Sequence, residues 1–213
     1  MPYPLNIMVF VKEVPDTQAV FINSETGTLK RESAGVILNP HDEAPVKLAL
    51  RLKAAHGARI TALSMGPKRT EGLMRYLSSL GFDRCVLLND PAFAGSDTLA
   101  TSTVLAAAVR FLGMPDLLLF GEQSSDGDTG QVPGQTAELL GIASFSRVQE
   151  LVLQEGGFRA VQRFYDDEIC EKEQVFPAAL SLLPLNQPFL FFPEARNFFQ
   201  ATPCEILKKT DLF

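Results

Sequence analysis

The segment Leu117-Leu-Leu-Phe-Gly-Glu-Gln-Ser-Ser-Asp-Gly-Asp-Thr-Gly-Gln-Val132 decides the fold of this chain. It opens with a short apolar run, Leu117–Phe120, passes through a polar stretch with two glycines, and leads into helix-like sequence at Thr136–Leu140. A continuous apolar run is typical of a strand that is buried on both faces of a parallel sheet. The segment therefore predicts a strand, a loop and a helix in succession.

The same alternation extends to both sides of this segment. Further strands are expected at Ile7–Val11, Ile60–Leu63, Cys85–Leu88 and Ala143–Val148. Helices are expected at Asp42–Ala55, around Leu73–Leu80 and at Ala100–Leu112, each closed by a following glycine. Strands that alternate with helices on this scale predict an α/β fold of the Rossmann-like kind, an open and mostly parallel sheet with helices on both faces.

The pattern changes after residue 150. Gly156-Gly157 lies between two strand-like stretches in 151–165, which indicates a β-hairpin, and Ala178–Leu183 is consistent with one more strand. The following residues are rich in phenylalanine, with Phe189, Phe191, Phe192, Phe198 and Phe199. We therefore expect a nucleotide-binding α/β domain over residues 1–185 and a short, irregular C-terminal tail over residues 186–213.

Composition excludes several classes of function. The net charge of −6 argues against a nucleic-acid partner, because phosphate neutralisation needs clustered Lys and Arg. No apolar run reaches the roughly 20 residues of a membrane span, and Lys12 and Glu13 follow the first run where a signal peptide has small residues. A cytoplasmic, or imported matrix-like, protein is expected.

The cysteines bear on redox function. Cys85, Cys170 and Cys204 are scattered and form no CxxC pair, and the chain has two histidines. A disulfide framework, a zinc site and an iron–sulfur cluster are therefore not expected. If the protein moves electrons, the redox group must come from an organic cofactor.

The loop after Leu117–Phe120 is the main candidate site. Ligands of open α/β sheets bind outside the carboxyl ends of the strands. Gly127 and Gly130 allow backbone N–H groups to turn inward, Thr129 adds a hydroxyl, and the next helix adds the positive end of its dipole. These donors suit a phosphate or pyrophosphate. The predicted cofactor-binding residues of this loop are Gly121, Glu122, Gln123, Ser124, Ser125, Asp126, Gly127, Asp128, Thr129, Gly130, Gln131 and Val132.

The loop leaves alternatives open. Asp126 and Asp128 repel an anion unless they point away, where they could cap the turn or accept ribose hydroxyls. The simpler interpretation is a polar strand-to-helix loop with an aspartate cap. The segment matches neither GxGxxG nor a Gly-Lys-Ser/Thr phosphate loop, so a phosphate site here would use neutral donors.

Three other strand ends should meet the same edge of the sheet. Asn39-Pro40-His41-Asp42 starts the first helix; Asn39 is extended because proline follows it, and its amide could read an adenine or ribose edge. Helix capping is the simpler interpretation there, and His41 is expected to be neither base nor ligand. Met65 in a strand-end turn and Phe10 at the end of the first strand complete the predicted site. No nucleophile, base and acid form a catalytic set.

An ordered series of motifs resembles the β subunits of electron-transfer flavoproteins. It comprises Val11–Thr17, Glu25–Leu29, Asn39–Glu43, Ala49–Lys53, Gly66-Pro67, Gly81–Arg84, Gly95–Thr98, Gly121–Val132 and Ala137–Gly141. The resemblance covers residues 6–185. An ordered series of this length is far more specific than any one of its members.

The resemblance implies a heterodimer with an α subunit that carries the electron-transferring FAD. It also implies an adenine-nucleotide site in this chain, filled by AMP or, in electron-bifurcating members, by a second FAD, and a redox partner dehydrogenase. Carried over, the site is Phe10, Asn39–Asp42, Met65 and the loop 121–132, the loops chosen above. The Asp126-Gly-Asp-Thr-Gly-Gln-Val132 form looks more like the FAD-capable bacterial branch.

Departures from the family pattern concern the helix start and the tail. Val132-Pro-Gly-Gln135 reverses the usual Gly-Pro order, which could shift the helix. Phe189-Leu-Phe-Phe192 replaces the Arg-Tyr segment by which family members dock on acyl-CoA dehydrogenases, so that docking is in doubt. The phenylalanines could pack on the domain itself or on another partner.

Two other functions compete with an electron-transfer subunit. One is an interaction module that has lost its nucleotide and its redox function. The other is an enzyme that hydrolyses the nucleotide, such as an ATP-pyrophosphatase of related fold. The second would need a Ser/Gly-rich loop after the first strand, where this chain has Lys12-Glu-Val-Pro15.

Overall fold

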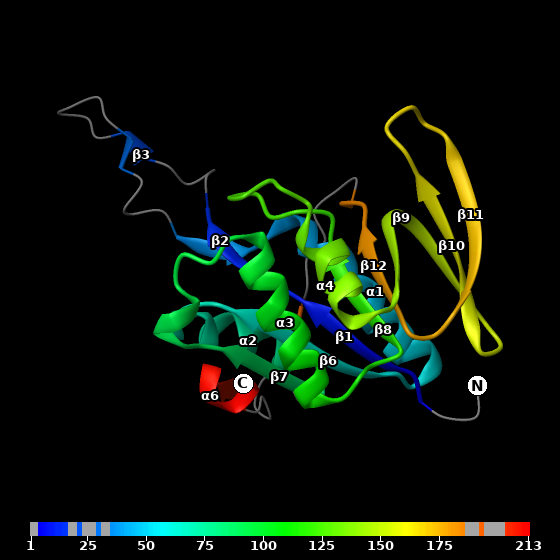
Figure 1. The fold of residues 1–213 in the computed structure, drawn as a ribbon. Coiled ribbons are helices and arrows are strands. Elements are labelled where there is room, and N and C mark those ends of the chain that lie inside the picture. The colour runs from blue at the N-terminus through cyan, green and yellow to red at the C-terminus, as the bar shows by residue number, and fades with distance from the viewer. Residues whose placement is uncertain (1–3, 17–20, 23–28, 31–34, 186–191, 194–202) are drawn as a thin grey trace.

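A computed structural model describes residues 4–16, 21–22, 29–30, 35–185, 192–193 and 203–213. Helices cover both faces of one large, mostly parallel sheet (Figure 1), so the predicted fold class is confirmed. The strands are β1 (Asn6–Phe10), β2 (Glu13–Pro15), β3 (Phe21–Ile22), β4 (Leu29–Lys30), β5 (Val36–Leu38), β6 (Arg59–Met65), β7 (Arg84–Leu88), β8 (Leu117–Gly121), β9 (Ala143–Gln154), β10 (Gly157–Arg163), β11 (Ile169–Val175), β12 (Ala178–Leu182) and β13 (Glu205–Leu207). The α-helices are α1 (Glu43–His56), α2 (Glu71–Leu80), α3 (Thr98–Leu112), α4 (Val132–Leu140) and α6 (Lys209–Leu212), and short 3₁₀ helices cover Pro40–Asp42, Lys68–Thr70 and Pro91–Phe93.

The sheet has nine strands in the order β11-β10-β9-β12-β8-β1-β6-β7-β13. Every pair from β9 to β13 along this order is parallel, and β10 is antiparallel to both of its neighbours. Two short pairs, β2 with β5 and β3 with β4, lie outside this sheet. The carboxyl ends of the central strands therefore meet at one edge.

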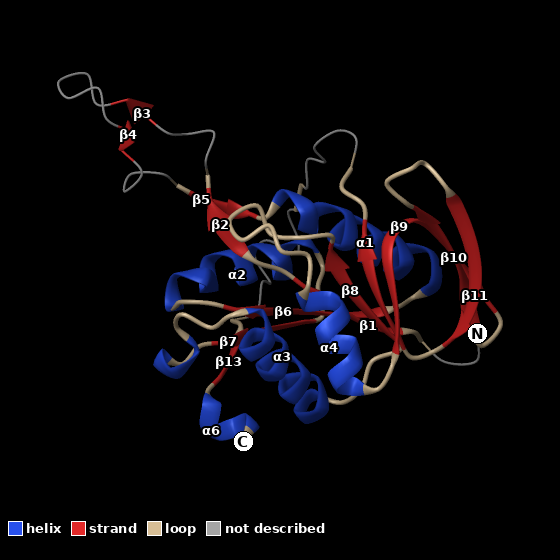
Figure 2. Cartoon of the chain, turned by 45° about the horizontal axis from the view of Figure 1, so that its top comes forward, coloured by secondary structure: helices blue, strands red, loops and turns tan. Residues whose placement is uncertain are grey.

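Strand β1 shows how the sheet separates two layers of core. Ile7 and Val9 pack in the same cluster as residues of α1 and α2, whereas Met8 and Phe10 pack with residues of α3 and α4. Figure 2 shows the two helix pairs on opposite sides of the sheet. Because side chains alternate along a strand, a continuous apolar run fills both layers.

Helix boundaries follow local chemistry. Helix α1 follows directly on the 3₁₀ turn Pro40–Asp42 and ends at Gly57, whose φ of 67° is left-handed. Helix α4 begins at Val132, four residues before the expected Thr136, because Pro133 suits the first turn of a helix. The reversed Pro-Gly order thus lies inside α4.

The antiparallel extension of β9, β10 and β11 contains the predicted hairpin. Its turn passes through Gly156, with φ of 74°, and a Cβ on Gly157 would stand 2.2 Å from the Gln174 carbonyl oxygen of β11. Strand β11 was not predicted from the sequence. Most of its residues are exposed, so it has no apolar pattern.

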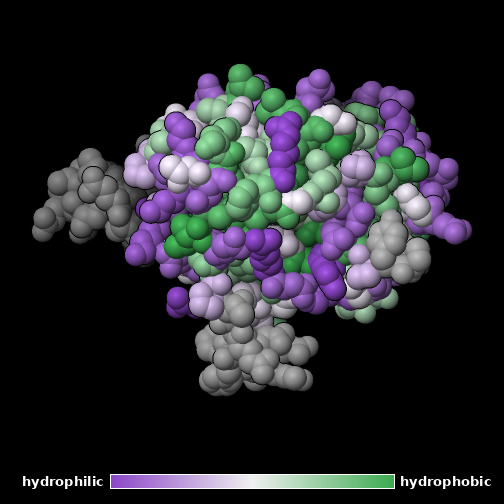
Figure 3. Space-filling model, turned by 60° about the horizontal axis from the view of Figure 1, so that its bottom comes forward, coloured by the Kyte–Doolittle hydropathy of each residue, from purple (hydrophilic) through white to green (hydrophobic). Residues whose placement is uncertain are grey.

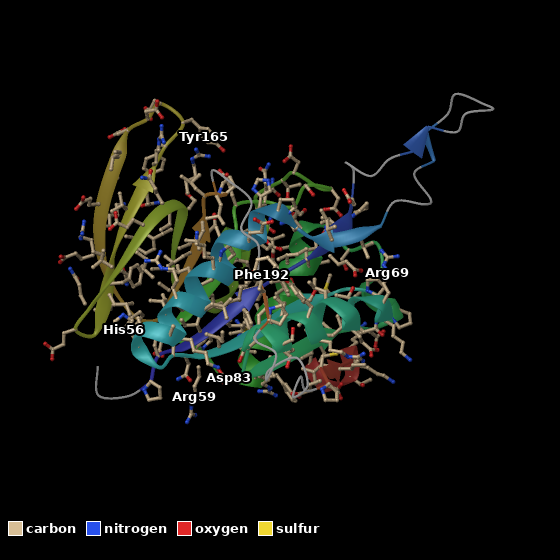
Figure 4. All side chains as sticks on the ribbon, turned by 180° about the vertical axis from the view of Figure 1, so that it is seen from behind. His56, Arg59, Arg69, Asp83, Tyr165 and Phe192 are labelled. Atoms are coloured by element: carbon tan, nitrogen blue, oxygen red, sulfur yellow. The ribbon has the colours of Figure 1, made fainter. Side chains whose placement is uncertain are left out.

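The last part of the chain joins the sheet. Strand β13 pairs in parallel with β7, and α6 lies beside α3. The sequence indicated only an irregular tail there, because a three-residue strand carries no periodic signal. Phe192, labelled in Figure 4, is 79% exposed, whereas Phe189, Phe191, Phe198 and Phe199 lie outside the described residues.

In the part of the chain that the structure covers, no helix combines the length and the apolar character needed to cross a membrane.

Candidate functional site

A cavity of about 650 Å³ lies at the carboxyl ends of β1, β6 and β8. One wall is a pair of parallel aromatic rings on neighbouring strands, Phe10 and Phe120, with centroids 3.9 Å apart and planes 8° from parallel. The remaining wall comes from the 93–98 loop, the start of α3 and the loop that leads into α4. The cavity thus occupies the position where open α/β sheets bind ligands.

Asp42 is the charged group at the base of this cavity. Its side chain is 5% exposed. Its carboxylate accepts hydrogen bonds from the backbone N–H of Lys12 at 2.8 Å and from Asn39 Nδ2 at 3.0 Å. Burial raises the pKa of Asp42 to about 7, although these hydrogen bonds, the Lys12 charge and the Gly121 N–H pull the pKa downward. The group therefore titrates near neutrality.

The structure corrects the expected helix cap at Asp42. Asp42 occupies the residue before α1, but its side chain makes no capping hydrogen bond to that helix. Instead it turns toward the end of β1, where the Lys12 N–H has no strand partner of its own and donates to the carboxylate. Asp42 therefore ties α1 to the central strand.

Asn39 is committed to protein partners. One amide N–H donates to Asp42, the other reaches the Gln123 carbonyl oxygen at 2.9 Å, and Oδ1 accepts from the Ser125 N–H at 3.2 Å. Both amide protons are thereby used. Asn39 holds the 121–132 loop in place, and reading a nucleoside edge with this amide would require one of these bonds to break.

Gly121 sits where no side chain fits. A Cβ there would stand 2.4 Å from Asp42 Oδ1 and 2.7 Å from the backbone of His41. The close approach lets the Gly121 N–H face the Asp42 carboxylate. Glycine at this position is thus a packing requirement of the site.

The loop from Glu122 to Gln131 is folded around its own polar groups. Gly127 and Asp128 donate backbone hydrogen bonds to the Ser124 carbonyl, at 3.3 and 2.8 Å. Asp128 and Gly130 have left-handed backbones, with φ of 53° and 61°. The loop then reaches α4, whose first residues have no side-chain cap. Val132, at the cavity wall, supplies a helix-start N–H that suits an anion, whereas Pro133, the next lining residue, has no N–H.

Helix α3 also starts at the cavity. Its N-cap Asp97 accepts from the Ala100 N–H at 2.7 Å. Thr98 and Thr101 contribute to the lining. Thr98 Oγ1 lies 3.1 Å from Gln131 Oε1, so the starts of α3 and α4 are joined across the wall.

Lys12 is the only cationic side chain in the lining formed by the described residues. Its Nζ lies 2.7 Å from Asp126 Oδ1, and this ion pair lowers the pKa of Asp126 against the opposing effect of burial. Asp126 lies outside the cavity lining, and its negative charge is paired with Lys12. An anion in the cavity would therefore be attracted less strongly to Lys12 than to an unpaired lysine, because Asp126 already pairs with the Lys12 ammonium group.

The predicted site residues divide into two groups. The cavity is lined by Phe10, Asn39, Asp42, Met65, Gly121, Gln123, Ser124, Gly127, Thr129, Gly130, Gln131 and Val132. Pro40, His41, Glu122, Ser125, Asp126 and Asp128 are outside the lining. Several of the second group support the loop: Glu122 pairs with Arg147 of β9, and Asp128 accepts from Gln123.

Sequence reasoning missed the 93–98 side of the cavity. Phe93 and Gly95–Thr98 line the wall opposite the predicted loop. A signal was present, because Gly95–Thr98 is one of the family-like motifs and Asp97 precedes an apolar helix as a typical cap. Its role could not be assigned without the strand order that brings β7 beside β6.

Comparisons with known proteins agree with this architecture. The model of the electron transfer flavoprotein domain matches residues 26–186. The protein FixA of Azorhizobium caulinodans is 39% identical over 162 residues, 74% of this chain and 58% of FixA. The electron transfer flavoprotein subunit beta of Clostridium acetobutylicum is 38% identical over 185 residues, 86% of this chain and 71% of that protein.

A third relative is named for a larger complex. The acryloyl-CoA reductase electron transfer subunit gamma of Anaerotignum propionicum is 44% identical over 140 residues, 65% of this chain and 52% of the relative. The chain thus spans between about half and three quarters of the length of these relatives.

Proposed function

Because the chain belongs to the electron transfer flavoprotein family, as a β-type subunit, we propose that it is an electron-transfer subunit. It binds an adenine nucleotide, AMP or FAD, in the cavity at the carboxyl ends of β1, β6 and β8. The observation that carries this proposal is the cavity wall itself. A glycine-containing loop and an uncapped helix start face a space of about 650 Å³ beside stacked aromatic rings.

The residues fit a nucleotide by their chemistry. Gly127, Thr129, Gly130 and the Val132 N–H at the start of α4 supply neutral donors for phosphate oxygens, with Lys12 at the edge. Asp42 offers a carboxylate that can accept from a hydroxyl or an exocyclic amine.

The chain's contribution to electron transfer would be positional. A bound flavin supplies the redox chemistry. The apolar side chains of the cavity exclude water from the bound group, while the loop and the helix starts fix its phosphates. Asn39 and Gly121 keep the loop in the shape that presents these donors.

The proposal includes partners. An electron-transfer flavoprotein α subunit is the expected second chain, and a dehydrogenase or reductase the expected redox partner; the third relative's name ties that relative to a reductase. Exposed apolar side chains on the antiparallel extension, Tyr165, Ile169 and Val175, and Phe192 near the tail support an interface. On the face in Figure 3, by contrast, hydrophobic and hydrophilic residues are interspersed. The expected location is the cytoplasm, with residues 1–185 as the nucleotide-binding domain.

The nucleotide content of the purified protein tests the proposal. The chain is co-expressed with a candidate α subunit, the complex is denatured, and released nucleotides are identified by absorbance and mass. We expect one adenine nucleotide per β chain. Two flavins per heterodimer would indicate FAD in this cavity, and one flavin plus AMP would indicate simple transfer.

A matched pair of glycine variants locates the nucleotide. Gly130→Val places a branched side chain on a left-handed residue beside the Glu122 carbonyl, so bound nucleotide should be lost. Gly134→Ala lies in α4 with open space around its Cβ position and should retain it. Two results together would instead support an interaction module that has lost its nucleotide. The wild-type complex would contain no nucleotide, and its melting temperature would not change when AMP, ADP or FAD is added.

A further inference from the structure

Two cysteines that are far apart in the sequence lie on neighbouring strands. Strand β13 pairs with β7 in the register Glu205↔Val86, Ile206↔Leu87 and Leu207↔Leu88. One step earlier, this parallel register places Cys204 beside Cys85. Figure 2 shows β13 alongside β7.

The two side chains point to the same face of the sheet. Cys85 belongs to the core cluster that includes α2, and Cys204 packs against that cluster, whereas Leu207 belongs to the cluster on the opposite face. Alternation along β13 gives Cys204 the side opposite to that of Leu207. The Cys204 thiol also adds to the raised pKa of Cys85, which is consistent with two sulfur atoms in proximity.

The spacing suits a bond between them. Neighbouring strands lie about 4.8 Å apart, and disulfides join residues whose Cα atoms are about 4.4–6.8 Å apart. Cys85 is buried and Cys204 half-buried, and both are free thiols. Cys204 is therefore the thiol that a solution oxidant meets first.

We propose that Cys85 and Cys204 form a redox-sensitive pair that closes into a disulfide when the protein meets a low-molecular-weight disulfide oxidant. The Cys204 thiolate attacks the oxidant, forms a mixed disulfide and releases one thiol. The Cys85 thiolate then attacks the sulfur of Cys204, and the second thiol of the oxidant leaves. Two protein thiols are oxidised and one oxidant disulfide is reduced to two thiols.

The surroundings make this closure slow. Burial raises the pKa of Cys85 to about 12. Burial and the Glu71 carboxylate raise the pKa of Cys204, which a backbone hydrogen bond and Arg75 partly offset. Few thiolates are present at neutral pH, so the bond should form over hours and respond to sustained oxidising conditions.

The bond would secure the segment beside the cavity. The Lys209 N–H after β13 donates to Asp90 Oδ2 at 3.1 Å, and Asp90 also accepts from the Ala92 N–H at 2.9 Å. The next residue, Phe93, lines the cavity. Any effect on nucleotide affinity rests on the proposed function, whereas formation of the bond does not.

Thiol counting tests the pair, with Cys170 as an internal control on the remote strand β11. The full-length protein, with any co-purified partner, is incubated with oxidised glutathione at pH 8, quenched with acid, and alkylated with iodoacetamide after denaturation. We expect one alkylated thiol fewer at each of positions 85 and 204 and a tryptic peptide pair joined by these two residues. The melting temperature should rise by roughly 10–20 °C, as for closing a loop on the order of 100 residues.

Two single variants decide the assignment. Cys204→Ser should abolish the linked peptide and the rise in melting temperature, whereas Cys170→Ser should retain both. Full alkylation of Cys85 after Cys204 has acquired glutathione would overturn the proposal, and so would a bond from either residue to Cys170. These outcomes are independent of nucleotide content, so they distinguish a failure here from a failure of the proposed function.

Discussion

The parallel part of the sheet and its antiparallel extension are built differently. From β12 to β7, strands are buried on both faces, and the carboxyl ends of β1, β6 and β8 form the cavity. Most residues of β9 and β11 are exposed or half-buried, whereas β10 between them is mostly buried. Arg159 and Glu171 form an ion pair across β10 and β11. The parallel part thus obtains its stability from burial and carries the candidate chemistry, while the extension presents surface.

Strand β9 joins the two regions, because it pairs in parallel with β12 and antiparallel with β10. Phe158 of β10 is fully buried and touches Phe145 and Phe176, with ring centroids 5.7 and 5.8 Å away. On the other side of the junction, Glu122 of the cavity loop pairs with Arg147 of β9, whose guanidinium also lies 3.8 Å from the Tyr165 ring centroid. Figure 4 shows Tyr165 and His56 at opposite ends of this junction.

The largest expected effect comes from removing the buried aromatic ring at the junction. Phe158→Ala should lower the free energy of unfolding by about 3–5 kcal/mol, because it deletes a fully buried side chain and leaves a cavity. Urea denaturation followed by circular dichroism measures this. Phe111→Ala, at a side chain 53% exposed, is the control and should change the value little. Equal losses of unfolding free energy in the two variants would contradict the burial of Phe158.

A smaller loss is expected from crowding the cavity base. Gly121→Ala should lower the free energy of unfolding by about 1–3 kcal/mol, since its Cβ overlaps Asp42 and the His41 backbone. Gly134→Ala, in the same region but in open space, should be neutral or stabilise α4 by about 0.5–1 kcal/mol. Matching denaturation midpoints for these two variants would contradict the close packing of Gly121.

The pH dependence of stability tests the burial of Asp42. Its folded pKa of about 7 lies above the ordinary aspartate pKa of 3.8, so the folded protein binds more protons than the unfolded chain between these values. This contribution is present below pH 4 and is lost as pH rises through 7, with a slope of at most about 1.4 kcal/mol per pH unit.

Asp42→Asn should remove this contribution. Urea denaturation of wild type and variant from pH 4.5 to 8 gives the difference in slope, in which the other carboxylates cancel. Parallel curves would show that Asp42 does not titrate in this window.

The smallest effect should come from the surface of the extension. Arg159→Met breaks an ion pair of 2.8 Å in which Glu171 is 57% exposed. We expect a loss of about 0.2–1 kcal/mol that shrinks in 1 M NaCl, because exposed pairs are weak and screened. Denaturation at two salt concentrations measures this; a salt-independent loss would mean that Arg159 acts by packing.

The same contrast explains how much the sequence could reveal. The strands of the parallel part are continuous apolar runs, so β1, β6, β7 and β8 were predicted close to their observed bounds. Strand β11 has the sequence Ile-Cys-Glu-Lys-Glu-Gln-Val and is exposed on most of its length, so neither its identity nor its pairing follows from hydrophobic pattern.

Within the site, the sequence predicted the binding loop but not the hydrogen-bond partners of its polar side chains. The loop with Gly127 and Gly130 was predicted from its glycines and from its position after a strand. Asn39 donates its two amide protons to Asp42 and to the Gln123 carbonyl oxygen. The second bond joins segments more than eighty residues apart, so the local sequence does not predict it. Tertiary packing determines these hydrogen-bond partners, and local sequence patterns do not predict it.

The strand order also has a consequence for biosynthesis. Strand β12 lies between β8 and β9, yet it follows both of them in the chain. When a ribosome has delivered β9, β10 and β11, these strands still have no neighbour in the parallel sheet, and the outer edge of β8 is still open. The central strands and their ligand-facing loops can assemble first, and five residues synthesised much later, Ala178–Leu182, then join the two halves.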